Sequence, residues 1–350
     1  MNESETPILV TGGCGFVGRH LVKSLLADGH SVWIIDNLSV GKHPDTWLDG
    51  FAKQESGSTS YQKGPQKVVF INEDIIDLLR RELTEAGSAG FPPFVEVYHL
   101  AAIVGGRAVL IEQDPMQIAT NHIIDSLFFQ WAVRNKEKIG RALYVSSSVA
   151  YPKALQDQGR AETHREDHLV FEESGNIGLP ESIYGWIKLA GEYLAVVAAQ
   201  KYDLKVCCVR PFNGYGEDQD LSYPIPSIAA RAARHEDPLT VWGSGDQSRD
   251  FVHVDDFVAA LRYTIANVTD GSAVNIGSGN NTTFKEVARI MANLAGYNPE
   301  IKGLTNKVEG SFALRADTSR LKSFGWEQKT PIDDGFAKVL KEVEARLKKE

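Results

Sequence analysis

The chain has 350 residues and a formal net charge of −9 at pH 7, without a long block of like charges. This charge argues against nucleic acid as a partner. No apolar run approaches the length that spans a bilayer, and the short acidic segment before Ile8 does not have the form of a signal peptide, which predicts a cytoplasmic protein. Three cysteines form neither a disulfide framework nor a metal-ligand pattern, so we expect no metal site.

The first half of the chain alternates short apolar runs with amphipathic segments, which predicts βαβ units and a parallel sheet. The expected strands are Ile8–Thr11, Ser31–Asp36, Lys67–Asn72, Glu96–Ala101, Ala142–Ser146 and Lys205–Arg210. The expected helices are Gly15–Asp28, Pro115–Asn135 and Ser182–Lys201.

Two regions look irregular. Residues 50–66 are rich in Gly, Ser and Gln and lack periodicity, which predicts an inserted surface loop. After Pro211, the segments Phe212–Gly216, Trp242–Asp250 and Asn275–Asn280 resemble ligand-facing loops, before a final amphipathic helix. We therefore predict an α/β protein with two domains sharing a cleft: a doubly wound, Rossmann-type domain over residues 1–212 and a smaller α/β domain over residues 213–350, with some later segments returning to the first.

A glycine-rich turn follows the first predicted strand. Gly12, Gly15 and Gly18 allow a tight turn, close approach to a pyrophosphate and close packing of a helix on a strand. The helix that begins near Phe16 and Val17 directs its amide donors and positive dipole at that phosphate. The turn therefore predicts a dinucleotide site.

An acidic residue follows the second predicted strand, as that site requires. Asp36, with Asn37 beside it, is placed to accept both ribose hydroxyls and to repel a 2′-phosphate, which favours NAD over NADP. Further along, Asp74 and Ile75 are expected to flank the adenine. After His99, the small residues Ala101 and Ala102 would let the backbone lie against the cofactor. Together with Leu100 they complete the expected set of cofactor contacts in this part of the chain. His99 itself is expected to pack or cap rather than catalyse.

Tyr184 is the only tyrosine with a lysine four residues later, Lys188. On a helix this spacing stacks both side chains on one face. An ammonium near a phenol favours the phenolate, so we expect a lowered Tyr184 pKa and a general base for an alcohol proton. A buried tyrosine with a snorkelling lysine would give the same pattern.

Taken together, these motifs resemble the extended short-chain dehydrogenase/reductases, and among them the nucleotide-sugar epimerase/dehydratase group. The resemblance covers nearly the whole chain. It is carried by the Thr11–Gly18 turn, Asp36, Asp74-Ile75, His99–Ala102, Asn121, Ser146–Ser148, Tyr184/Lys188, Arg210–Asn213 and Arg249–Phe251. It implies a tightly held NAD that is reduced and reoxidised within one turnover, with Asn121, Tyr184 and Lys188 among its contacts, and a sugar linked to a nucleoside diphosphate as substrate.

The same resemblance implies oxidation of a sugar hydroxyl to a ketone, with Tyr184 as the base and Lys188 holding the nicotinamide ribose. Alignment on Tyr151 makes Ser147 the catalytic serine, with Ser146 and Ser148 as alternatives, and Ser148 also a substrate contact. Three consecutive serines could also be only a polar strand end.

Departures from the family pattern narrow the reaction. Dehydratases of the group carry an Asp-Glu pair after the catalytic serine or threonine, where this chain has Ser148-Val149. Enzymes that epimerise beside the ketone place a cysteine at Val149 and a His or Lys near Tyr223. A C4 epimerase needs no second acid/base pair and is the predicted activity. Epimerisation at C3 or C5, 4,6-dehydration and a catalytically silent NAD-binding sensor or scaffold remain alternatives.

On the substrate side, the resemblance implies that Asn213 and Arg249 contact the sugar diphosphate, with Arg315 near a second arginine position. The alternative for Arg249 is a surface arginine paired with Asp250 or Asp246. The segment His164–His168 lacks the order of a zinc hydrolase motif and is expected to be a solvated, charge-rich loop. Homodimerisation through the helices 115–135 and 182–201 is also implied by the resemblance.

Overall fold

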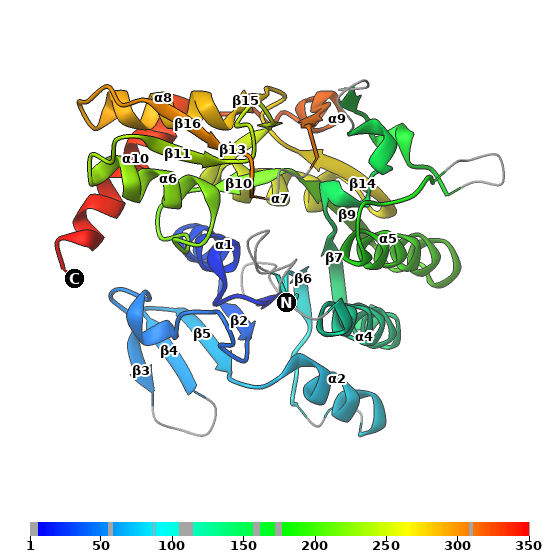
Figure 1. Ribbon diagram of the computed structural model, residues 1–350. Coiled ribbons are helices and arrows are strands. Elements are labelled where there is room, and N and C mark those ends of the chain that lie inside the picture. Colours follow the sequence, from blue (N-terminus) through cyan, green and yellow to red (C-terminus); the bar gives the residue numbers. More distant parts are fainter. Residues whose placement is uncertain are drawn as a thin grey trace.

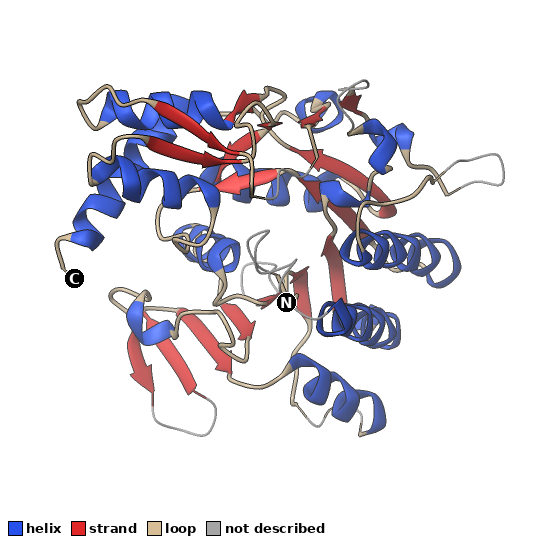
Figure 2. Cartoon of the chain, viewed as in Figure 1, coloured by secondary structure: helices blue, strands red, loops and turns tan. Residues whose placement is uncertain are grey.

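The computed structural model describes residues 6–54, 59–85, 87, 89–104, 115–156, 162–171, 177–307 and 311–349. A large twisted sheet runs through these residues, with helices on both faces (Figures 1 and 2). This is the α/β, Rossmann-type architecture predicted from the sequence. Across the sheet, its nine strands in the described residues are β14 (Asp270–Ile276), β9 (Val206–Pro211), β7 (Ile139–Val145), β6 (Phe94–His99), β1 (Ile8–Thr11), β2 (Val32–Ile35), β5 (Gln66–Ile71), β4 (Thr59–Lys63) and β3 (Ala52–Gln54).

From β14 to β5 all neighbouring strands are parallel, and the chain order reverses on either side of β1. In such sheets a crevice forms outside the carboxyl ends of the strands at this switch point. The ends of β1, β6, β7 and β9 therefore share one edge. Thr11 pairs in register with His99 there, which places the glycine-rich turn beside the segment after β6.

The helices in the described residues are α1 (Phe16–Ala27), α2 (Ile75–Thr84), α4 (Pro115–Arg134), α5 (Ile183–Tyr202), α6 (Pro224–Ala233), α7 (Val254–Asn267), α8 (Phe284–Leu294), α9 (Ser319–Ser323) and α10 (Ile332–Leu347). Ile8 and Val10 of β1 share a hydrophobic cluster with residues of α1 and α7, whereas Leu9 lies in a cluster with α2, α4 and α5. This alternation follows from the two-residue period of a strand. Both faces of the sheet are thus covered, as a parallel sheet requires.

A second core lies between α6, α8 and α10, along the upper side of Figure 1. Phe336 and Val339 of α10 pack there against Ile228 and Met291, as the apolar face of the final helix predicted. Smaller sheets lie beside this core. In two of them β10 (Asn213–Tyr215) pairs with β13 (Phe251–His253), and β11 (Leu239–Trp242) pairs with β16 (Ile301–Leu304). Another contains, in order, β15 (Thr282–Thr283), β12 (Ser248–Arg249), β17 (Ala313–Ala316) and β8 (Thr163–His164).

Several sequence expectations were wrong. The region predicted as a surface loop over residues 50–66 contains, among its described residues, β3 and β4, which extend the large sheet as antiparallel strands. The segment after Pro211 contains β10, residues 242–250 contain β12, and β14 continues to Ile276, so these segments are partly strands. Helix α2, which follows Asp74, was not predicted. Strands β6, β7 and β9 were predicted within one to three residues of their observed bounds.

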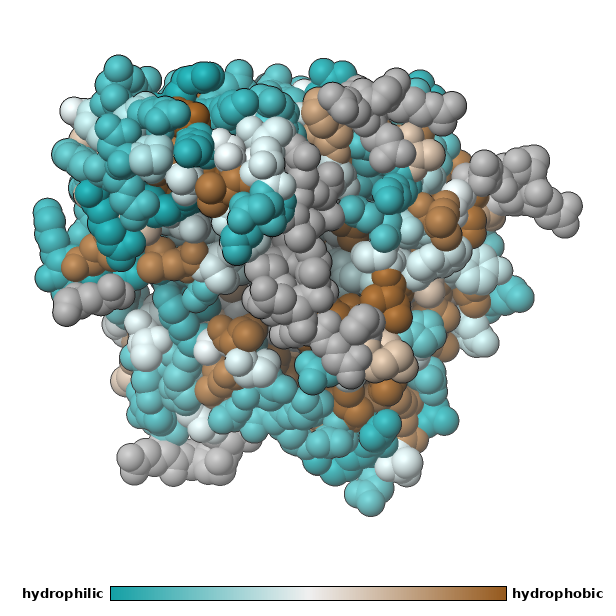
Figure 3. Space-filling model, in the orientation of Figure 1, coloured by the Kyte–Doolittle hydropathy of each residue, from teal (hydrophilic) through white to brown (hydrophobic). Residues whose placement is uncertain are grey.

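Among the described residues, no helix is both long and apolar enough to cross a membrane. Figure 3 shows a largely hydrophilic face, with hydrophobic groups gathered on the side where α4 and α5 lie.

A buried ion pair fixes α5 against the sheet. Arg210 of β9 and Glu192 of α5 are each 2 % exposed and lie 2.8 Å apart, between Arg210 Nη2 and Glu192 Oε2. Ser146 Oγ also donates to Glu192, and Arg210 donates to the Tyr151 hydroxyl at 3.0 Å. Because α5 carries Tyr184 and Lys188, this network sets where those side chains lie relative to the strand ends.

We expect Glu192→Gln to lower the free energy of unfolding by about 3–5 kcal/mol, because it leaves the Arg210 guanidinium buried without its counterion. Arg165→Gln is the matched control, since it removes an Arg–carboxylate pair whose side chains are 56 % and 63 % exposed. That control is expected to be close to neutral. Denaturant titration measures both variants, and equal effects would contradict the role given to the buried pair.

Candidate active site

The glycine-rich turn packs directly against the segment after β6. Gly12 has φ +69°, and a Cβ on it would lie 2.8 Å from the Ala101 amide nitrogen and 2.9 Å from the Leu100 carbonyl carbon. At Gly18 a Cβ would lie 2.2 Å from the Gly12 carbonyl oxygen. Side chains are therefore excluded from the turn, and the N-terminus of α1, capped at Gly15, remains open to an anion.

Asp36 lies at the end of β2, beside this turn. Its carboxylate accepts hydrogen bonds from the Cys14 amide at 2.9 Å and from the Leu38 amide at 2.8 Å. Burial raises the pKa of Asp36, although these backbone donors and Arg19 oppose that effect. The carboxylate is thus held at the edge of the turn, in the position expected of a ribose contact.

The other predicted cofactor residues lie around the same edge. Asp74 caps α2 through the Ile76 amide at 2.9 Å and accepts a hydrogen bond from the Asn37 side chain at 2.9 Å. Asn121 of α4 is fully buried and pairs with both backbone groups of Ile103, at 2.6 and 2.9 Å. Asn121 therefore supports the segment after β6.

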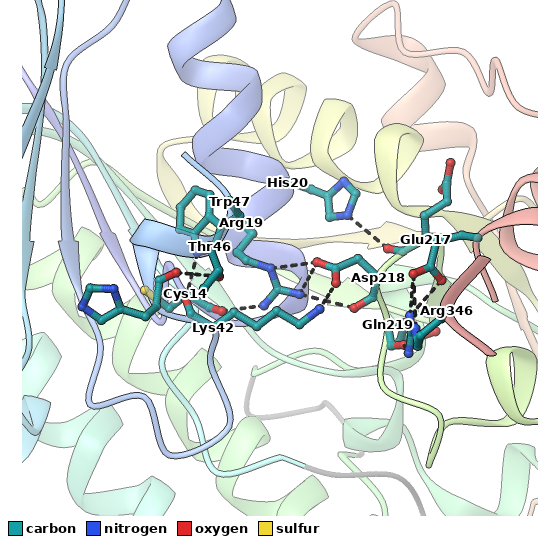
Figure 4. A network of polar contacts seen from close by, with 12 residues as sticks. Cys14, Arg19, His20, Lys42, Thr46, Trp47, Glu217, Asp218, Gln219 and Arg346 are labelled. Atoms are coloured by element: carbon teal, nitrogen blue, oxygen red, sulfur yellow. Dashed lines mark hydrogen bonds and ion pairs between the residues drawn. The ribbon is translucent and has the colours of Figure 1, made fainter. Parts of the chain in front are cut away.

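Figure 4 shows a polar network behind the turn that sequence reasoning missed. Arg19 is 3 % exposed and donates to the Cys14 carbonyl and, at 2.6 and 3.0 Å, to the Asp218 carboxylate. Lys42 pairs with the same carboxylate. These contacts join the glycine-rich turn to the loop after β10. An arginine one residue after the third glycine was visible in the sequence, but nothing there indicated its partner.

The serine segment lies against the first turn of α5. A Cβ on Gly185 would lie 2.3 Å from the Val149 carbonyl oxygen, so glycine permits this approach. Ser146 is buried and donates to Glu192, whereas Ser147 caps the short helix Ser148–Ala150 and stays partly exposed. Ser147 is therefore better placed than Ser146 to meet a ligand. Tyr184 is in the same first turn of α5 as Gly185.

The environment of Lys188 differs from the expectation. Its ammonium lies 5.8 Å from the centroid of the Tyr184 ring, but also 3.7 Å from a carboxylate oxygen of Asp125 on α4. The pKa of Tyr184 is raised, not lowered as predicted, because burial and the Asp125 charge both oppose its ionisation. The sequence prediction failed because it counted the lysine but not the burial of the phenol, which has the largest effect, nor the nearby Asp125 charge.

The predicted substrate residues lie on the smaller strands. Arg249 of β12 is 6 % exposed, and Arg315 lies on the adjacent strand β17, where its Nε donates to Thr163 Oγ1 at 2.8 Å. Arg249 is not a surface arginine paired with Asp246 or Asp250, because Asp246 pairs with Lys285, and Asp250 accepts from the backbone of residues 278, 279 and 316. Among the described residues the side-chain oxygen of Asn213 has no hydrogen-bond partner, and as an acceptor it suits a donor group of a ligand rather than a phosphate oxygen.

The segment His164–His168 is not a wholly solvated loop as predicted. His164 lies in β8, is fully buried and contacts the Tyr151 ring edge-on, and burial lowers its pKa to about 4. Within the part of the chain that is described, no cluster of three or more His, Cys, Asp or Glu could hold a metal ion.

Comparison with known proteins identifies this arrangement. The model of the NAD dependent epimerase/dehydratase family matches residues 8–277. The chain belongs to this family. It is therefore an enzyme of the extended short-chain dehydrogenase/reductase type, and NAD is its cofactor.

Two curated relatives and one solved structure indicate the range of similarity. The chain is 25% identical over 338 residues to UDP-glucuronic acid decarboxylase 1 of Xenopus tropicalis, covering 95% of this chain and 71% of that one. It is 28% identical over 342 residues to UDP-glucose 4-epimerase of Mycolicibacterium smegmatis, covering 95% and 96%. A UDP-glucose 4-epimerase of Thermotoga maritima, solved with UDP-glucose, superposes with a TM-score of 0.77 over 98% of this chain and 100% of that one, and at 24% identity it shows the fold alone.

The residues present fit NAD. The cradle formed by Gly12 and Gly18 excludes side chains and lies at the start of α1, while Asp36 stands at the end of the next strand. These groups would hold the pyrophosphate and a ribose, respectively. Their positions in this site were predicted from the sequence.

We expect Gly12→Ala to weaken NAD binding by about tenfold or more, because the substitution combines a positive φ with a backbone clash at Ala101. Gly64→Ala is the matched control, since Gly64 also has a positive φ, +59°, but a Cβ there meets no atom within 4 Å. Isothermal titration calorimetry of the cofactor-free protein measures both. Equal losses would show that the close approach to Ala101 is not what the site depends on.

Proposed function

We propose that the chain epimerises a nucleoside-diphosphate sugar at C4. The observation that carries this proposal is the short segment after β7, where Ser147 and Ser148 are followed by Val149, packed against the turn of α5 that holds Tyr184. A hydroxyl and a phenol suffice to handle one sugar hydroxyl. Val149 cannot move a second proton, and C4 inversion through a ketone does not require one.

Tyr184 is the proposed base that takes the proton of the C4 hydroxyl and later returns it. Ser147 donates to, or accepts from, the same sugar oxygen. Lys188, whose ammonium lies 5.8 Å from the Tyr184 ring centroid, is proposed to hold the hydroxyls of the nicotinamide ribose. When bound, NAD accepts the hydride from C4 and gives it back to the opposite face of the ketone.

Asn213, Arg249 and Arg315 are the proposed contacts of the sugar diphosphate. A guanidinium suits a pyrophosphate because it donates two parallel hydrogen bonds. Arg249 and Arg315 lie on adjacent strands, and Asn213 would meet the diphosphate through its side-chain NH2, because its oxygen can only accept. These contacts specify neither the nucleobase nor the sugar of the substrate. The substrate class proposed here is therefore a nucleoside-diphosphate hexose.

A second candidate reaction is suggested by the similarity to a UDP-glucuronic acid decarboxylase. Loss of carbon dioxide from a sugar acid also begins with a C4 ketone, which stabilises the electron pair left on C5, and C5 then takes one proton, for which water suffices and Val149 is not required. Epimerisation at C3 or C5 and 4,6-dehydration, in contrast, need an acid/base pair beside the ketone. A silent NAD-binding sensor would not require the intact set of Ser147, Tyr184 and Lys188.

Proton NMR in deuterated water separates these reactions. The enzyme is incubated with NAD and a panel of UDP-, GDP- and dTDP-hexoses and UDP-glucuronic acid. We expect a product with inverted C4 and no deuterium in the ring. Deuterium at C3 or C5, a 4-keto-6-deoxy sugar or a pentose product would each contradict the proposal and identify the reaction instead.

Tyr184→Phe should reduce kcat by about a thousandfold while NAD binding changes little, because only the proton acceptor is lost. Turnover and calorimetric NAD affinity are measured on the same preparation. Undiminished turnover would exclude Tyr184 as the base, and loss of NAD binding would show that the phenol supports the cofactor site instead.

We further propose that the protein is a homodimer formed through α4 and α5. Ile183, Trp186 and Tyr193 lie within a narrow sector of α5 and are 40 %, 42 % and 53 % exposed, and Ile123 of α4 is 42 % exposed. Apolar side chains gathered in this way mark interaction surfaces. The cytoplasmic location predicted from the sequence stays a prediction.

Replacing both Trp186 and Tyr193 with Glu should convert the dimer to a monomer in sedimentation velocity, because four carboxylates would enter a two-fold apolar interface. Tyr202→Glu is the control: this tyrosine is 48 % exposed on the same helix, but on the opposite side. A monomeric wild type, or dissociation by the control alone, would contradict the proposed interface.

A further inference from the structure

A cluster of buried polar side chains lies on the inner side of Tyr184, and the reaction proposed above does not use all of it. Asp125 comes from α4, His99 from β6, Tyr144 from β7 and Lys188 from α5. Their exposed fractions are 0 %, 1 %, 0 % and 2 %. A carboxylate buried to this degree is unfavourable unless cations or donors compensate its charge, so its surroundings indicate what it does.

Hydrogen bonding fixes which way the donors point. Thr11 Oγ1 accepts from the Ala101 amide at 3.2 Å, which leaves its hydrogen for His99 Nδ1 at 2.8 Å. Burial lowers the pKa of His99, so the ring is neutral and its hydrogen lies on Nε2. That nitrogen is 3.4 Å from Asp125 Oδ1, a close polar approach, although neither atom makes a hydrogen bond within the described residues. The ring therefore turns its donor side toward Asp125 and stacks on Phe128 at 4.0 Å between centroids.

The second oxygen of Asp125 faces the catalytic helix. Tyr144 donates its hydroxyl to Asp125 Oδ2 at 2.6 Å, and the Lys188 ammonium lies 3.7 Å from the same oxygen. Burial opposes ionisation of Asp125, but Lys188, His99 and Tyr144 together bring its pKa below the usual range. Asp125 is therefore an anion, and its principal counterion is the lysine that approaches Tyr184.

The position of Lys188 follows from this contact. The ammonium lies 4.8 Å from the Tyr144 ring centroid and 5.8 Å from that of Tyr184, so it is near both phenols as well as the Asp125 carboxylate. The titratable groups facing Asp125 are thus Lys188 and Tyr184 of α5, His99 of β6 and Tyr144 of β7. The chain of contacts through His99 ends at Thr11, the residue before the glycine-rich turn.

We propose that Asp125 is a positioning residue for the proposed reaction: its buried carboxylate holds the Lys188 ammonium beside Tyr184 and offsets its charge, and His99 and Thr11 tie that carboxylate to the cofactor turn. The inference rests on the proposed function for its kinetic consequence only. The pairing itself concerns the folded protein and is tested without substrate.

The first test is a double-mutant cycle in thermal unfolding of the full chain without cofactor, using Asp125→Asn, Lys188→Met and the double variant. Each single change leaves one buried charge without its partner, whereas the double change removes both. We expect the double variant to lose several degrees less than the sum of the singles. If Asp125→Asn does not fold and the double variant does, the interaction between Asp125 and Lys188 is strong and the pairing is supported. Additive losses, or a double variant that does not fold, would overturn the pairing.

The second test is kinetic and uses Tyr144→Phe as the matched control, because that change removes one hydrogen bond to Asp125 and keeps the carboxylate. We expect Asp125→Asn to lower kcat by about ten- to a hundredfold with KM for the nucleotide sugar changed less than about threefold, and Tyr144→Phe to alter both by less than about threefold. Equal kcat losses in the two variants would overturn the positioning role. Absence of turnover in the wild type with every sugar would refute the proposed function and leave the unfolding cycle as the test of the pairing.

Discussion

The site depends on one close contact, that between the glycine-rich turn after β1 and the backbone after β6. No Cβ fits between Gly12 and Ala101, so the carboxyl ends of two strands that are far apart in sequence lie against each other at the switch point of the sheet. The start of α1 is thereby exposed at the same edge as Asp36 and the serine segment. Short-range backbone geometry, more than any side-chain interaction, brings the proposed cofactor-binding groups to the sheet edge where α5 begins.

Buried charge then sets the position of that helix. Glu192 of α5 is paired with Arg210 of β9, and Lys188 of α5 is paired with Asp125 of α4. Each pair joins α5 to a different neighbour, Glu192 to β9 and Lys188 to α4. Because a buried charge without a partner is strongly destabilising, α5 has little freedom to slide or rotate. The phenol of Tyr184 is accordingly held in one place relative to Ser147.

The parts predicted from the sequence are those encoded by local patterns. Glycine spacing indicates a backbone conformation, and a tyrosine four residues before a lysine indicates a shared helix face, so the turn at Gly12 and Gly18 and the helix that carries Tyr184 and Lys188 were predicted without a structure. Strands β3 and β4 were missed because their side chains are mostly polar and their pairing is antiparallel at the sheet edge. The loop-like reading after Pro211 failed because β10 has only three residues and depends on a distant strand, β13.

Long-range electrostatics was the part that the sequence did not reveal. Asp125, Lys188, His99 and Tyr144 come from four elements, and no spacing in the chain indicates that they meet. The predicted direction of the Tyr184 pKa was wrong mainly because the phenol is buried, and also because the Asp125 charge lies near it. The Arg19–Asp218 contact was missed because its members are 199 residues apart.

The most direct test of the proposed chemistry follows the hydrogen on C4. A nucleotide hexose that the enzyme turns over is prepared with deuterium at C4, and the product is analysed by NMR and mass spectrometry in ordinary water. We expect the deuterium to stay on C4 while the configuration at that carbon inverts. Deuterium found at C6 would indicate dehydration, and deuterium lost to water would show that C4 is inverted by proton exchange, which contradicts the roles given to Tyr184 and the cofactor.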